Sequence, residues 1–261
     1  MDYERRAGGA TRAVAAHIVS QLSLSPNAEP VVLDNACGTA AVTDEILKRF
    51  PSAKIHAVDG SVGMIDVAKL TIEQKGWTGR VETGVMDGQK LTFGEEMFDI
   101  SMTNFGIFFF PDPEAGAREV WRTLKRGGRA VVTCWKEPGL VPLLHDCQKF
   151  IRPKTSIESL PVLEKWMRKE TIEQVMKQGG FQDVLIESFD SMIGGKDEKE
   201  MVFGVSENLK GIVGEQWGNE EKAHLQGAVE MLLRGKGSSL FVEKHGKRGV
   251  PMVAWIATCK K

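Results

Sequence analysis

The stretch VVLDNACG, residues 31–38, has the form of a buried strand that runs directly into a tight turn. Its first three residues are apolar, and Gly38 supplies a position that turns at little steric cost. A related stretch, HAVDGS at residues 56–61, follows one strand–helix–strand unit later. The carboxyl ends of neighbouring parallel strands are where ligands bind in an open sheet. The two stretches therefore predict a binding site at one edge of a parallel sheet.

Asp59 closes the second of these strands. A carboxylate there is well placed to accept from both hydroxyls of a ribose, with charge-assisted hydrogen bonds of about 1.5–3 kcal/mol each. The alternative is a helix N-cap, because Asp59 and Ser61 both precede a helix that is expected from residue 62. The two roles are compatible.

The turn after the first strand lacks the glycines of a dinucleotide site. A G-x-G-x-x-G turn lets a pyrophosphate touch bare backbone, whereas this chain has Ala36, Gly38 and Ala40 at the comparable positions. Asp34 would also repel a phosphate and favours a cation instead. Gly38 taken alone could be an ordinary turn glycine.

The words VLDNACGTA (residues 32–40) and HAVDGS resemble the first two motifs of the class I S-adenosylmethionine-dependent methyltransferases. The wording is most similar to small fungal-type methyltransferases of secondary metabolites, including thiol methyltransferases. The resemblance implies S-adenosylmethionine as cofactor and S-adenosylhomocysteine as product. The departure is Ala40, where the family often has glycine.

The resemblance also implies roles for residues along the strand ends. Asp34, Ala36 and Gly38 would hold the methionine end, and Asp59 the ribose. The remaining candidates for cofactor contact are Met64 beside the ribose and adenine, Met86 and Asp87 at the adenine, and Asn104 and Phe105 after the fourth strand. Met64 could instead be a core methionine of its helix, and Asp87 an ordinary turn aspartate.

The acceptor side is expected to be apolar. Phe109 belongs to the run FGIFFFP (residues 105–111), part of which could form a wall beside the transferred methyl. Trp135 could stack on a flat substrate or simply sit at the edge of the core. Tyr3 precedes the first helix, which could cover the ligand. His145 is the candidate general base and a candidate substrate contact, although a histidine beside leucines is often structural.

Strands alternating with helices predict an α/β fold with a doubly wound, Rossmann-like sheet. The family resemblance implies seven strands in the order 3-2-1-4-5-7-6, mostly parallel with an antiparallel last strand. We expect one methyltransferase domain over residues 1–261, with its core at 25–136, 170–189 and 250–261. Residues 137–169 and 190–249 are long for loops and are predicted to be helical cap insertions, with helices near 197–212 and 219–234.

Composition narrows the classes of function. The net charge of −1 lacks the excess of basic residues that is typical of nucleic-acid-binding proteins. The four cysteines lack C-x-x-C spacing and are expected to be reduced thiols of a cytoplasmic protein. We see no signal segment, membrane span, metal constellation, P-loop or G-x-S-x-G word.

These observations predict methyl transfer to an oxygen, sulfur or nitrogen atom of a hydrophobic small molecule, with a secondary metabolite as the expected acceptor. The first alternative is a protein that binds the cofactor without methylating, such as a regulator or a cyclase. A nicotinamide oxidoreductase would require the missing glycines. A macromolecular methyltransferase would require a charged groove or an added recognition domain, and neither is evident.

Overall fold

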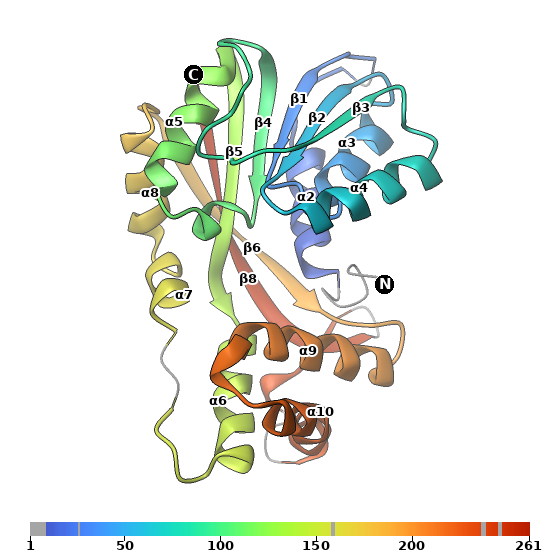
Figure 1. Ribbon diagram of the computed structural model, residues 1–261, viewed down its shortest axis with the longest axis vertical. Helices are drawn as coiled ribbons and strands as arrows, with labels where there is room; N and C mark the ends of the chain where they lie inside the picture. The colour runs from blue at the N-terminus through green and yellow to red at the C-terminus, as the bar shows by residue number, and fades with distance from the viewer. Residues whose placement is uncertain (1–8, 26, 158–159, 236–238, 245–246) are drawn as a thin grey trace. The chain divides into compact units, whose positions relative to one another are not determined.

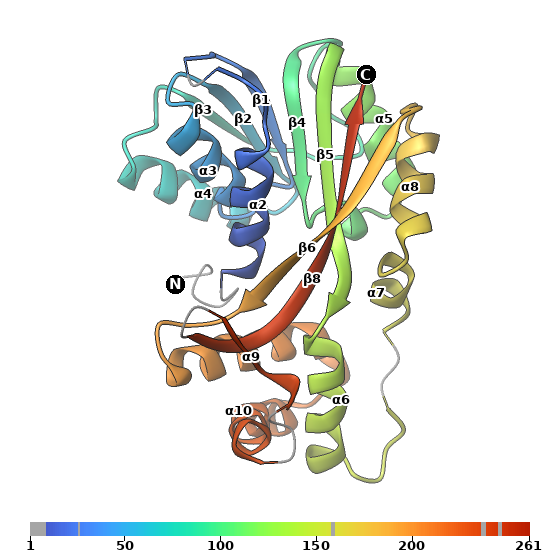
Figure 2. The same ribbon diagram turned by 180° about the vertical axis from the view of Figure 1, so that it is seen from behind.

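The computed structural model describes residues 9–25, 27–157, 160–235, 239–244 and 247–261. Within them an eight-stranded sheet has the order β3-β2-β1-β4-β5-β8-β6, and β7 pairs with β8. β8 runs opposite to β5 and β6 (Figure 2). The strands are β1 Val31–Asn35, β2 Lys54–Asp59, β3 Val81–Val85, β4 Phe98–Asn104, β5 Leu124–Pro138, β6 Val184–Ile193, β7 Val242–Lys244 and β8 Lys247–Lys260. The predicted fold class and strand order are confirmed, with β8 as the antiparallel last strand.

Helices separate most of the strands (Figure 1). Their bounds are α2 Ala10–Ser20, α3 Ala41–Arg49, α4 Val62–Gln74, α5 Pro113–Thr123, α6 Leu140–Ile151, α7 Pro161–Trp166, α8 Lys169–Gln178, α9 Glu198–Val213 and α10 Asn219–Arg234, with 3₁₀ turns at Ile107–Phe109 and Gly214–Gln216. Within the described ranges, no helix combines the length and the apolar character that crossing a membrane requires.

The chain divides into two compact units. The sheet unit comprises residues 11–136, 162–189 and 255–261, and the helical unit comprises the described residues of 1–10, 137–161 and 190–254. In the helical unit α6, α9 and α10 pack on one another. Their apolar faces bury Leu143, Val205, Leu209, Leu225 and Val229. A capping role for the predicted insertions stays a prediction.

The register of the sheet unit brings the polar strand ends to one edge. Asp34 pairs with Ala57, Asp59 with Val85 and Asn104 with Thr133, all between parallel neighbours. On one face of the sheet, α5 and α8 bury a core that includes Leu33, Val58, Val120, Val132 and Ile172. This core gives the strand ends a rigid base.

Residues 125–128 belong to β5, although the sequence Lys-Arg-Gly-Gly is typical of a tight turn. Gly127 has a φ of 79°, yet β5 begins at Leu124. The reason is a backbone partner far along the chain, because the Gly127 N–H donates to the Lys261 carbonyl at 2.8 Å and the Lys261 N–H donates to the Gly128 carbonyl at 3.1 Å. A local signal of turn residues cannot reveal such a partner.

Asp44 joins three elements of the sheet unit. Its side chain is 2% exposed and accepts from Arg12 of α2. Lys75, just after α4, donates to it at 2.9 Å, and Lys48 lies 3.3 Å away. Burial acts to raise the pKa of Asp44, but the hydrogen bonds from Lys75 and Arg12 outweigh it and hold the pKa below its usual range.

We expect Asp44→Asn to lower the free energy of unfolding at pH 7 by about 1–3 kcal/mol, because the cations lose their charged acceptor. Since the folded-state pKa lies below the unfolded value, this contribution is complete above pH ~4 and is lost as pH falls through the folded pKa. Urea unfolding at pH 7 and pH 3 measures it, with Asp66→Asn on the exposed side of α4 as control. An equal loss at both pH values would contradict the assignment.

Candidate functional site

The turn after β1 is wound through left-handed backbone. Ala36, Gly38 and Ala40 have φ angles of 58°, 53° and 66°. An L-residue in this region costs roughly 1–2 kcal/mol, and glycine costs little. The positions that correspond to the glycines of other nucleotide turns thus keep the glycine conformation, although two of them are alanine.

The absence of a side chain at Gly106 leaves room for the Ala36 methyl. A Cβ placed on Gly106 would lie 2.5 Å from the Ala36 Cβ and 3.2 Å from Thr103 Cγ2. Gly106 has a φ of −105°, which any residue can adopt. Space rather than backbone angle therefore requires glycine at 106, and the turn after β4 packs directly on the turn after β1.

Asp34 is the buried acid at the end of β1. Its Oδ2 accepts from the Thr43 N–H at 3.1 Å and from the Thr43 hydroxyl at 2.8 Å. Ala40, the N-cap residue of α3, has no side-chain acceptor, so Asp34 satisfies a free N–H of the helix first turn in its place. Burial raises the pKa of Asp34 to about 6 against the Thr43 hydrogen bonds, and the charge of Asp59 adds to the rise. Its Oδ1 is buried without a partner among the described residues.

Asp59 connects the turn after β1 to the start of α4. Its Oδ2 accepts from the Gly38 N–H and its Oδ1 from the Ser61 N–H, both at 2.9 Å. Ser61 is the N-cap of α4 and accepts from the Met64 N–H at 3.4 Å. Each Asp59 oxygen keeps a lone pair for another donor. The carboxylate is half-buried and held in one orientation, as a ribose acceptor must be.

The two methionines lie near Asp59. Met86 donates its N–H to the Asp59 carbonyl at 3.0 Å, and its side chain packs against the core beside α5. The Met86 sulfur accepts from the Thr92 N–H at 3.4 Å. Met64 is half-buried in the first turn of α4. Their contact with an adenine stays a prediction.

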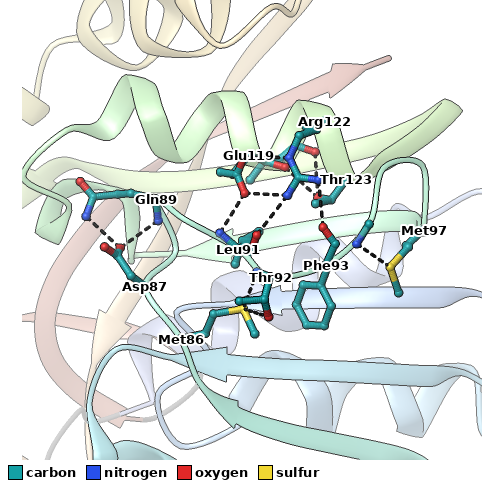
Figure 3. A network of polar contacts seen from close by, with 12 residues as sticks. Met86, Asp87, Gln89, Leu91, Thr92, Phe93, Met97, Glu119, Arg122 and Thr123 are labelled. Atoms are coloured by element: carbon teal, nitrogen blue, oxygen red, sulfur yellow. Dashed lines mark hydrogen bonds and ion pairs between the residues drawn. The ribbon is translucent and has the colours of Figure 1, made fainter.

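Residues 86–93, the first part of the β3–β4 loop, are held by side chains of α5 (Figure 3). Glu119 Oε2 accepts from the Leu91 N–H at 2.8 Å, and Arg122 donates to the Leu91 carbonyl at 3.1 Å and to the Phe93 carbonyl at 2.9 Å. The two side chains pair with each other at 2.8 Å. They replace the backbone partners that a strand or helix would supply. The loop thus presents Asp87 from a fixed frame.

Asn104 and Phe105 are held at the end of β4. Asn104 Oδ1 accepts from the Thr133 hydroxyl at 2.9 Å, and its Nδ2 donates to the Thr11 carbonyl at 3.3 Å. Thr133 Oγ1 also accepts from the Phe105 N–H at 2.9 Å. Phe105 has a φ of 56°, and its ring stacks on Trp135 with centroids 4.0 Å apart. An aromatic pair thus joins the end of β4 to the side of β5.

The other acceptor candidates are placed differently. Phe109 is 77% exposed, in the 3₁₀ turn after β4. Tyr3 lies outside the described residues. His145 belongs to α6 of the helical unit, and its Nε2 is buried without a partner among the described residues. The roles of all three stay predictions.

Two further histidines, both in the sheet unit, pack against aromatic rings. His17 stacks on Phe189 with centroids 4.1 Å apart, and His56 meets Phe93 and Phe98 edge-on. The part of the chain that is described contains no group of three or more histidine, cysteine or acidic side chains arranged to hold a metal.

Sequence reasoning missed three residues of this edge, Thr133, Asn35 and Gln89. Thr133 lies inside an apolar strand, where one hydroxyl carries no signal of its partners. Asn35, the last residue of β1, is buried with both side-chain polar atoms unpaired among the described residues. The Asp-Gly-Gln turn at 87–89 could have indicated Gln89, because asparagine and aspartate side chains often accept from residues two positions on.

Comparisons with known proteins agree with this geometry. A family model described as "Methyltransferase domain" matches residues 32–128. "Methyltransferase tpcH" of Aspergillus fumigatus is 27% identical in an alignment of 253 residues that covers 88% of this chain and 84% of the relative. "Ubiquinone/menaquinone biosynthesis C-methyltransferase UbiE" of Geobacter sp. is 30% identical in an alignment of 168 residues that covers 59% of this chain and 71% of the relative. Among solved structures, the [4+2]-cyclase SpnF aligns with a TM-score of 0.60 at 18% identity, covering 96% of this chain and 81% of the other. The last likeness concerns the fold alone.

The packing of Ala36 on Gly106 can be tested by adding a methyl group at position 106 and removing the one at position 36. Gly106→Ala alone should lower the free energy of unfolding by about 1–3 kcal/mol, because its new methyl overlaps that of Ala36. Ala36→Gly removes the overlap and one left-handed alanine, so the double variant should regain most of the loss. A double-mutant cycle by urea unfolding measures the coupling, which we expect to exceed about 1 kcal/mol. Gly211→Ala, on α9 with open space around it, is the control. Additive effects would count against the contact.

Asp34 gives the ligand-free protein an inverted pH dependence. Its folded pKa of about 6 lies above the unfolded value of about 4, so the folded state binds the extra proton between these values. Stability should therefore fall as pH rises from about 4 through 6, by on the order of 2–3 kcal/mol.

Asp34→Asn keeps an acceptor for Thr43 and removes the charge, so its stability relative to the natural chain should rise across this range. Chemical unfolding at half-unit pH steps is the measurement, with Asp66→Asn as the matched control. A constant difference between Asp34→Asn and the natural chain from pH 4 to 7 would rule out the buried charge as its cause.

Proposed function

We propose, on the premise that this chain belongs to the class I S-adenosylmethionine-dependent methyltransferases, that it methylates an oxygen, sulfur or nitrogen atom of a hydrophobic small molecule. The observation that carries the proposal is the Asp59 carboxylate. It is fixed by the Gly38 and Ser61 N–H groups and still has lone pairs for the two hydroxyls of a ribose.

The residues of the sheet unit fit the cofactor. Asp34 leaves one buried oxygen unpaired at the turn where a sulfonium or ammonium would lie, and a nearby cation would favour its ionised form. Asp59 suits the ribose, and Asp87 offers an exposed acceptor for the adenine amino group. Asp34, at the turn after β1, disfavours a pyrophosphate there, and this acid separates the site from a nicotinamide site, in which an acid also binds the ribose.

The acceptor side is argued from aromatic surface. Phe105, which follows β4, stacks on Trp135 of β5, and Phe109 is nearby in sequence and mostly exposed. Such surfaces favour flat or apolar molecules. The likeness to a relative from Aspergillus and the fungal-type wording of the motifs favour a secondary metabolite as the acceptor.

When bound, S-adenosylmethionine supplies a methyl group that its sulfonium has already activated. The protein needs to align the reactants, which can contribute about 7–11 kcal/mol. Asn104 is fixed by Thr133 and Thr11, so it can serve as a rigid boundary of the site. The Phe105–Trp135 pair excludes water from one side. A thiol or carboxylic acid acceptor needs little help with its proton, and His145 is the candidate base for other acceptors.

The ligand assignment is tested by thermal shift with S-adenosylmethionine, S-adenosylhomocysteine, NAD⁺ and NADP⁺. Either adenosyl ligand at 100 times its Kd should stabilise the folded state by about 2.7 kcal/mol, and the nicotinamide ligands should not. Asp59→Ala should weaken binding of both adenosyl ligands by about 10- to 100-fold, because charge-assisted bonds to the ribose are lost. Asp66→Asn, exposed on the neighbouring helix α4, is the control.

Undiminished binding to the Asp59→Ala variant would overturn the site. Turnover is then measured with labelled S-adenosylmethionine against thiols, phenols, carboxylic acids and amines. Activated carbon acceptors join the screen because the Geobacter relative is named a C-methyltransferase. Tight binding without transfer to any of these acceptors would favour a regulator or a cyclase.

A further inference from the structure

The two oxygens of Asp87 have different surroundings. Oδ1 accepts from the Gln89 N–H at 2.9 Å and from the Gln89 side-chain Nε2 at 2.8 Å. Among the described residues no donor contacts Oδ2, and the side chain is exposed at the end of β3. One oxygen is thus used to fix the carboxylate, which leaves the other for a ligand.

Gln89 is itself held in one orientation. Its Oε1 accepts from the Asp112 N–H at 2.6 Å, and Asp112 is the N-cap of α5, accepting from the Ala115 N–H at 2.8 Å. Because the amide oxygen already has a donor, the amide nitrogen must point the other way, toward Asp87. A chain of hydrogen bonds therefore runs from the start of α5 through Gln89 to Asp87.

The frame of this chain is rigid. Glu119 and Arg122 hold the β3–β4 loop to α5 two to four residues beyond Gln89 (Figure 3). Phe110 closes the other side, because Cβ atoms placed on Gly88 and Gly116 would each lie 2.4 Å from its ring. The distance between Gln89 and Asp112 is fixed by packing as well as by their hydrogen bond.

We propose that Gln89 is a positioning residue that orients Asp87, so that Oδ2 accepts from the exocyclic amino group of adenine and the site discriminates adenosyl from inosyl cofactors. The inference rests on the proposed function. An inosine ring presents a carbonyl oxygen where adenine presents an amino group, so a carboxylate fixed at that point attracts one ring and repels the other. A freely rotating carboxylate could turn away and would discriminate less.

The test compares the Kd of S-adenosylhomocysteine with that of S-inosylhomocysteine by calorimetry. The natural chain should prefer the adenosyl ligand by about 10- to 100-fold. Gln89→Met keeps the volume of the side chain and the backbone hydrogen bond to Asp87 but removes both side-chain hydrogen bonds, so it should reduce the preference by about 5-fold or more. Gln89→Glu keeps an acceptor for the Asp112 N–H but repels Asp87, and should reduce it at least as much. Gln174→Ala, exposed on α8, is the control and should leave the preference unchanged.

The ratio of the two affinities separates positioning from general damage. A variant with a loosened fold would bind both ligands less tightly and keep the ratio, so an unchanged ratio in Gln89→Met and Gln89→Glu overturns the inference. A natural chain that binds both ligands equally also overturns it, whereas a natural chain that binds neither overturns the proposed function instead. With any acceptor that is turned over, Gln89→Met should raise KM for S-adenosylmethionine and leave kcat nearly unchanged.

Discussion

The hydrogen bonds from Thr43 to the buried Asp34 carboxylate set the geometry of the sheet edge where we propose that the cofactor binds. They join the end of β1 to the first turn of α3 across nine residues, so the turn between them has both ends fixed. Asp59 then fixes its middle through the Gly38 N–H. Two acids thus occupy the donors that an anion would otherwise use. A nucleoside with a cationic tail fits such an edge, and one with a pyrophosphate does not.

The same fixed turn explains how alanine is tolerated where glycine would be unstrained. Ala36 and Ala40 together cost on the order of 2–4 kcal/mol of left-handed strain. Ala40 is fully buried, so the packing of its methyl group offsets part of this strain. Ala36 meets the bare backbone of Gly106. Gly106, in the turn after β4, therefore leaves the space that the Ala36 methyl occupies. The two turns pack together as one unit.

Strand ends and helices followed from the sequence because their signals are local. The motifs around Asp34 and Asp59 indicated the sheet edge where the cofactor is proposed to bind, and the helices expected near 197–212 and 219–234 match α9 and α10 to within about a residue. The function of individual atoms did not follow. Nothing local shows that Asp34 serves as the missing cap of α3, or that Thr133 binds Asn104 from 29 residues away. Such pairs depend on register, which is known only when the sheet is built.

The β3–β4 connection shows how a side-chain network can replace a secondary-structure element. Without a helix of its own, the loop leaves the backbone polar groups of Leu91 and Phe93 to be satisfied by other means. Glu119 and Arg122 satisfy them from α5, whose opposite face is packed in the core through Ala117 and Val120. The position of Asp87, just after β3, is consequently fixed relative to the core through α5. Changes in α5 should therefore act on Asp87, the proposed adenine contact, whereas the aromatic pair of Phe105 and Trp135 is held separately by Thr133.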